Sequence, residues 1–171
     1  MGSTPRRGFT LVELLIVIVI IMLLAALLLP AIIKAMCNGR AAAAKHMISQ
    51  VEMAASQYES MQGVYPPGKG DGSKELVYYL EKKGPRNQPY FEFQADQKHE
   101  GNIVNPVWGH DGEPPSNIIK YRNNVATKGL APKGGGGMPP IYNKTKFDMW
   151  AAGCDFKPGN EPSLWSVNNW E

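Results

Sequence analysis

The chain begins with an apolar run that is long enough to cross a membrane and that contains a single carboxylate. Residues 9–29 form a stretch of 21 residues in which only Thr10 and Glu13 are not apolar. A helix of about 20 apolar residues spans a bilayer, and an ionisable side chain inside such a span is costly and usually functional. The run therefore predicts a membrane helix, with Glu13 as the first candidate functional residue.

The segments on either side of this run do not fit an ordinary cleaved secretory signal. Arg6 and Arg7 precede the run, but its apolar core is longer than the roughly 7–15 residues of a signal peptide. No convincing small-residue cleavage site follows near Pro30. The residues alone therefore leave open an uncleaved signal anchor on a periplasmic binding protein or enzyme, in which Met1 would be retained.

The junction at residues 7–13, Arg-Gly-Phe-Thr-Leu-Val-Glu, resembles the processing site of the type IV pilin and type II secretion pseudopilin family. The resemblance implies that a prepilin peptidase cuts between Gly8 and Phe9 on the cytoplasmic side. The new N-terminal Phe9 would then be methylated. Glu13 would become the fifth residue of the mature chain and would act in assembly.

The fold implied by the resemblance is α+β and pilin-like, with a long N-terminal helix packed on a small antiparallel sheet. Four parts follow from it. They are a prepilin leader peptide at 1–8, a transmembrane and assembly helix at 9–30, an amphipathic helix extension at 31–62, and a periplasmic globular part at 63–171.

The helix extension carries an apolar stripe whose members recur every three or four residues, which predicts an amphipathic helix. We expect this stripe to pack on the sheet, although a dimerising coiled coil is the alternative. Charged residues repeat every seven positions beside it and are expected to face solvent. Gly63 is expected to end the helix. The stripe consists of Ala44, Met47, Val51, Ala54, Tyr58 and Met61, and the charged residues are Lys45, Glu52 and Glu59.

The remainder is rich in Gly and Pro and shows weaker signals. Ser73 is expected to cap a short helix over Lys74–Lys83. Strands are expected at Tyr90–Phe93, Ile118–Arg122 and Lys146–Ala151.

Charge and composition argue against nucleic acid and against catalysis. Loss of Arg6 and Arg7 with the leader leaves 16 basic and 15 acidic side chains, whereas a nucleic-acid-binding domain shows a clustered basic face. The three histidines lie far apart, and nothing in the sequence indicates an enzyme. A disulfide between Cys37 and Cys154 is allowed in an oxidising compartment. Both are nevertheless expected to be free thiols, since one lies near the membrane end of the helix and the other near the chain end.

Residues 147–155 and 168–170 resemble the tail of the major pseudopilin of type II secretion. That resemblance implies a calcium-binding C-terminal loop, with Asp155 in the place of the first acidic ligand. However, Leu164 and Ser166 stand where the family has acidic side chains. We therefore expect no cofactor and a loop closed by packing of tryptophans, Trp165 and Trp170, and we leave calcium at Asp155 as the alternative.

Together these resemblances imply a structural subunit of a type II secretion pseudopilus. It would polymerise through its N-terminal helix to help export folded proteins across the outer membrane. The chain would cross the bacterial inner membrane once, with its C-terminal domain in the periplasm. Its partners would be the prepilin peptidase, other copies of itself, minor pseudopilins and the inner-membrane secretion platform. A type IV pilin for adhesion, motility or DNA uptake is the main alternative, and a C-terminal disulfide loop would favour it.

Overall fold

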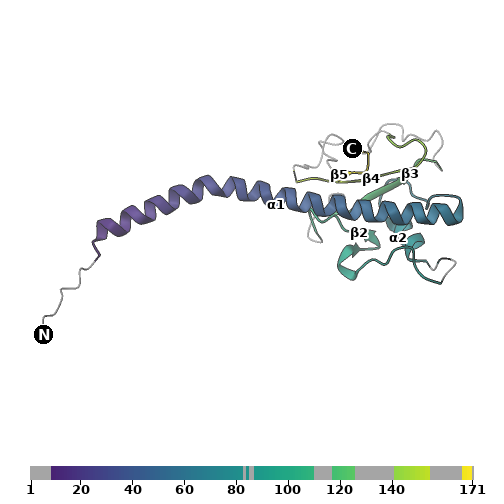
Figure 1. The fold of residues 1–171 in the computed structure, drawn as a ribbon, viewed down its shortest axis with the longest axis horizontal. Coiled ribbons are helices and arrows are strands. Elements are labelled where there is room, and N and C mark those ends of the chain that lie inside the picture. The colour runs from purple at the N-terminus through teal and green to yellow at the C-terminus, as the bar shows by residue number, and fades with distance from the viewer. Residues whose placement is uncertain are drawn as a thin grey trace. The chain divides into compact units, whose positions relative to one another are not determined.

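The computed structural model describes residues 9–82, 84, 87–109, 117–125, 141–154 and 167–170. These residues form an α+β fold, as predicted, with two α-helices, one short 3-10 helix and five short strands (Figure 1). In chain order the elements are α1 (Leu11–Gln62), α2 (Lys74–Glu81), η1 (Ala95–Gln97), β1 (Lys98–His99), β2 (Asn102–Ile103), β3 (Lys120–Asn123), β4 (Phe147–Ala151) and β5 (Val167–Asn168).

Helix α1 is the dominant element and is continuous through Pro30. The chain divides into two compact units, Met1–Asn38 and Gly39–Glu171. The helix ends as expected at Gly63, which has a φ of 76° and whose N–H donates to the Glu59 carbonyl at 2.7 Å. Glycine reaches this left-handed conformation without the strain that a side chain would cause.

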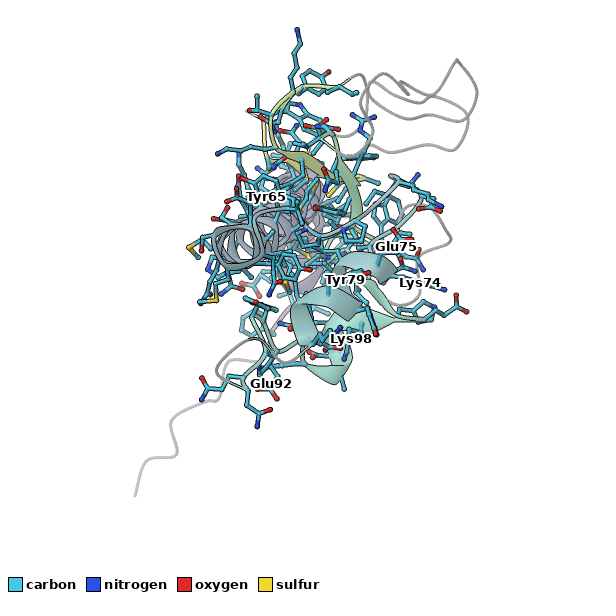
Figure 2. All side chains as sticks on the ribbon, turned by 90° about the vertical axis from the view of Figure 1, so that its right-hand side faces the viewer. Tyr65, Lys74, Glu75, Tyr79, Glu92 and Lys98 are labelled. Atoms are coloured by element: carbon cyan, nitrogen blue, oxygen red, sulfur yellow. The ribbon has the colours of Figure 1, made fainter. Side chains whose placement is uncertain are left out.

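The second unit is built around the C-terminal half of α1. Figure 1 shows β3, β4 and β5 along one side of this half, and α2 and β2 on another side. The view in Figure 2, turned by 90°, separates the same two groups around α1. One hydrophobic core joins them, and it includes Ala44, Met47, Ile48, Val51, Ala54 and Ala55 of α1, Leu76, Val77 and Leu80 of α2, Ile103 of β2, Tyr121 of β3, and Phe147 and Met149 of β4.

The predicted apolar stripe is confirmed over most of its length. Its first four members are buried, and Tyr58 is partly buried against the core. The prediction is wrong at the last position, because the Met61 side chain is 45% exposed. In this last turn, Gln62 donates instead to the Tyr90 hydroxyl at 3.0 Å.

Strands β3, β4 and β5 form an antiparallel sheet in that order. The predicted strands at 118–122 and 146–151 correspond to β3 and β4, with Tyr121 opposite Met149. The loop at 68–72 pairs along the free edge of β3: the Tyr121 N–H donates to the Gly72 carbonyl and the Asn123 N–H to the Gly68 carbonyl, each at 3.0 Å. A Cβ on Gly68 would overlap the Tyr121 ring, so glycine allows the loop to cover this sheet edge.

Helix α2 forms where it was predicted, but Ser73 does not cap it as expected. Ser73 occupies the N-cap position without a side-chain capping hydrogen bond. Its hydroxyl instead accepts the Ile103 N–H at 2.8 Å, and its own N–H donates to Asn102 Oδ1 at 2.9 Å. Ser73 therefore joins α2 to the β1–β2 hairpin.

The predicted strand at Tyr90–Phe93 is wrong. The backbone N–H groups of Tyr90 and Phe91 both donate to the Leu80 carbonyl, at 2.9 and 3.2 Å. They thereby satisfy a carbonyl at the C-terminal end of α2, where helical partners run out. The alternating aromatic residues serve packing instead, because Phe93 is buried and the Phe91 and Phe93 rings lie 4.5 Å apart.

Candidate processing and assembly site

The first turn of α1 holds Glu13, the predicted assembly residue, in a reciprocal capping arrangement with Thr10. The Glu13 N–H donates to Thr10 Oγ1 at 3.2 Å. In return, the Thr10 N–H and the Thr10 hydroxyl each donate to Glu13 Oε2 at 2.9 Å. This is a capping box, in which the side chains of the N-cap and third helical residues satisfy each other's backbone donors.

The capping role of Thr10 was missed in the sequence analysis, although a signal was present. Thr10 is followed three residues later by Glu13, directly before a long apolar run, and this spacing is the sequence signature of a capping box. Gly8 lies outside the described residues, whereas the Phe9 side chain is 82% exposed. A cut between Gly8 and Phe9 would leave both members of the capping box on the mature chain.

Beyond this turn, α1 exposes a long series of large apolar side chains. The helix is apolar and long enough to cross a membrane, and the side chains of its most apolar stretch are not buried within the chain. Every Leu, Ile, Val and Met at positions 11–36 is exposed. A surface of this kind needs an apolar environment, which lipid or neighbouring helices would provide.

A second polar cluster lies on the three-stranded sheet and was not predicted. Arg122 of β3 donates from Nη2 to Asp148 Oδ2 of β4 at 2.7 Å, and both side chains are almost fully buried. The carboxylate also accepts the N–H of Tyr142 at 3.1 Å and that of Asn143 at 2.9 Å. Arg122 Nε donates to Asn124 Oδ1 at 2.9 Å. The pair therefore ties the segment preceding β4 to the sheet.

Aromatic side chains pack around this ion pair. The Arg122 guanidinium lies over the Trp150 ring, 5.3 Å from its centroid. The Tyr142 and Trp170 rings stack with centroids 4.4 Å apart and planes within 10°. The predicted closure of the C-terminal loop by Trp165 and Trp170 stays a prediction, because Trp165 and the loop lie outside the described residues.

The calcium alternative at Asp155 stays a prediction, because Asp155 also lies outside the described residues. Within the part of the chain that the structure describes, no group of three or more His, Cys, Asp or Glu side chains is placed to hold a metal ion.

The expectation of free thiols is wrong. Cys37 and Cys154, the only cysteines of the chain, are both disulfide-bonded. The positions of the two cysteines along the sequence, which were the reason for expecting free thiols, do not decide whether a cysteine is bonded. Cys154 also packs against the hydrophobic core.

Comparison with known protein families gives one match, which falls on the site described above. Residues 4–29 match the prokaryotic N-terminal methylation motif, a span that includes the predicted cut, the capping box and most of the exposed apolar helix. No curated protein and no solved structure matches the chain. The motif implies processing by a prepilin peptidase and pilin-like assembly of a membrane-anchored protein. The chain therefore has the N-terminus that characterises the type IV pilin and pseudopilin family.

Proposed function

We propose that the chain is a structural subunit of a type II secretion pseudopilus and performs no chemistry of its own. The observation that carries this proposal is the methylation motif at residues 4–29, followed by a helix whose large apolar side chains are exposed. Before assembly, the bacterial inner membrane would cover this surface. After assembly, the helices of other copies and of minor pseudopilins would cover it, with the inner-membrane secretion platform driving the transfer.

The tail of the chain supports a secretion subunit over a surface pilus. Residues 147–155 and 168–170 resemble the tail of a major pseudopilin, and strands β4 and β5 pair within them. A disulfide loop confined to the C-terminal region would favour a pilus. The chain cannot form one, since Cys154 is the only cysteine after Cys37.

The disulfide-bonded cysteines support the proposed orientation. Stable disulfides are rare in the cytosol and common in the periplasm and outside the cell. The bonded state of Cys154 supports an oxidising compartment for the globular part. We therefore propose that it lies in the periplasm and that only the leader faces the cytoplasm.

Deletion of the gene in its native host distinguishes the secretion subunit from a pilin. We expect exported enzymes to accumulate in the periplasm of the deletion strain and to reappear in the medium on complementation. Cell-surface fibres, surface motility and DNA uptake should be unchanged. The measurement compares marker-enzyme activity in periplasmic and medium fractions with fibre counts by electron microscopy. Normal secretion together with lost fibres or motility would instead identify a type IV pilin.

A further inference from the structure

The N-terminal end of α2 presents backbone donors that the rest of the described chain does not satisfy. An α-helix leaves its first N–H groups without partners inside the helix, and Ser73 makes no side-chain capping hydrogen bond to them. The Ser73 hydroxyl is turned to the Ile103 N–H instead. As a result, three N–H groups have no hydrogen-bond acceptor among the described residues, those of Lys74, Glu75 and Leu76.

This end of α2 lies at a cavity of about 380 Å³, which we call the polar cavity. Lys74, Glu75 and Leu76 line it, together with Asn102 of β2 and residues of the loop at 68–72. Its volume is within the range of sites that hold small ligands.

Asn102 brings a second set of unused donors to the polar cavity. Its side chain is 9% exposed, and its Oδ1 accepts the Ser73 N–H at 2.9 Å. This bond fixes the orientation of the carboxamide, because the amide nitrogen cannot accept a hydrogen bond. The Nδ2 group has no partner in the part of the chain that the structure describes, yet it is not sealed inside the protein. Buried polar groups normally have a partner, so the unused Nδ2 donors point to a ligand in the cavity.

The charges around the polar cavity select the kind of ligand. Backbone N–H groups at a helix N-terminus, with the positive end of the helix dipole, bind anions. Lys69 and Lys74 add two positive charges to the lining, and Asp71 and Glu75 add two negative charges. Because the two carboxylates repel a doubly charged phosphate more strongly than a singly charged anion, this balance favours a carboxylate.

A second, more open hollow of about 490 Å³ shares Lys74 and Glu75 with the polar cavity. Its other lining residues are Pro67, Tyr78 and Tyr79, and we call it the tyrosine hollow. The Tyr78 side chain is 63% exposed, and its ring packs edge-on against that of Tyr79 at 5.3 Å. Figure 2 shows Lys74, Glu75 and Tyr79 near one another on α2. Tyrosines combine an apolar ring with a polar tip, which suits a surface that binds a partner.

We propose that the polar cavity and the tyrosine hollow together bind a peptide segment of another protein, in which a carboxylate stands next to an apolar side chain. The carboxylate accepts hydrogen bonds from the N–H groups of α2 and from Asn102 Nδ2. The apolar neighbour packs on Tyr78 and Pro67. A small carboxylic acid fills only the polar cavity, whereas a peptide uses the continuity of the two hollows. This inference goes beyond the proposed function, because it assigns a partner-binding surface on α2.

Four labelled peptides, blocked at both ends, test the site by fluorescence anisotropy on the detergent-solubilised full-length chain, with micelles alone as the baseline. The first peptide carries a glutamate beside a tryptophan. The second has glutamine for the glutamate, the third has glycine for the tryptophan, and the fourth has phosphoserine for the glutamate. We expect the first to bind about tenfold tighter than the second, because charge-assisted hydrogen bonds are lost with glutamine. It should bind about threefold or more tighter than the third, which lacks the aromatic ring, and tighter than the fourth.

Asn102→Asp is the sharpest variant, because it retains an oxygen that can accept the Ser73 N–H and replaces the amide donors with a repelling carboxylate oxygen. We expect it to weaken binding of the glutamate peptide about tenfold or more, with a melting temperature close to that of the parent. Lys74→Gln, at an exposed side chain, should weaken binding about threefold. Lys144→Gln is the matched control and should bind like the parent, since Lys144 is exposed and lines neither hollow.

Equal binding of the glutamate and glutamine peptides would overturn the site, as would parent-like binding by both Asn102→Asp and Lys74→Gln. Tighter binding of the phosphoserine peptide would contradict the assignment of a carboxylate. If sodium acetate displaced the first peptide at an equal concentration, the ligand would be a small acid and the role of the tyrosine hollow would be wrong.

Discussion

Asp148→Ala is expected to remove about 3–5 kcal/mol from the free energy of unfolding, the usual cost of breaking a buried ion pair from one side. The substitution leaves the buried Arg122 guanidinium without its carboxylate. It also leaves the N–H groups of Tyr142 and Asn143 without the acceptor that they now share. This is a large share of the roughly 5–15 kcal/mol that stabilises a typical domain.

Glu81→Ala is the matched control, because it breaks the other ion pair of the described residues. Lys98 Nζ lies 2.6 Å from Glu81 Oε1, but both side chains are about one-third exposed. Surface pairs of this kind contribute about 0–1 kcal/mol. The distance between Lys98 and Glu81 is slightly shorter than that between Arg122 and Asp148. The exposed pair nevertheless contributes less to stability, because water can replace either of its partners.

Urea unfolding of the detergent-solubilised chain, followed by tryptophan fluorescence, compares the two substitutions. Trp150 lies against Arg122 and should report the loss of the sheet directly. An Asp148→Ala chain that unfolds within about 1 kcal/mol of Glu81→Ala would show that the buried pair does not hold the sheet and the preceding segment together.

Glu13→Val is expected to insert into the membrane at the parent level and to enter fibres poorly, with a yield lowered by about tenfold or more. The predicted cleavage after Gly8 would create a positive amine on Phe9. In a fibre of staggered helices, Glu13 of one copy can approach the amine of a neighbour in a poorly hydrated layer, where an unpaired charge is costly. Correct axial register would relieve that cost, so the carboxylate would select the register.

Glu13→Gln separates this charge from the capping role seen in the structure. Glutamine can also accept the Thr10 N–H in a capping box, but it carries no charge. If charge pairing directs assembly, Glu13→Gln should fail in fibres almost as severely as Glu13→Val. Immunoblots of the membrane fraction measure insertion, and the amount of sheared fibres measures assembly. Parent-like fibres from Glu13→Gln would reduce the role of Glu13 to helix capping.

The features of the N-terminal helix could be predicted from the sequence because their signals are local. The membrane helix follows from the length of the apolar run, and Glu13 stands out as the single carboxylate within it. The buried face of the helix extension follows from the helical spacing of Ala44, Met47 and Val51. The helix end at Gly63 needs only the conformational freedom of glycine. Thr10 could have been added by the same reasoning, since a capping box is read from four consecutive residues.

The features that were missed depend on contacts between distant segments. The strand prediction at Tyr90–Phe93 failed because the backbone there bonds to Leu80 of α2, which no local pattern reveals. Arg122 and Asp148 look like surface charges in the sequence and become buried only when β3 pairs with β4. The bonded state of the two cysteines is likewise not visible in the residues around each of them.

Intact-mass analysis of the membrane-extracted chain, expressed together with an active prepilin peptidase, tests most directly whether it is a processed pilin-like subunit. We expect a chain that begins at Phe9, lacks residues 1–8 and carries one added methyl group on its N-terminal amine. Gly8→Leu should block this change, because the peptidase requires a small residue before the cut. A parent chain that retains residues 1–8 in the presence of the active peptidase would contradict the account.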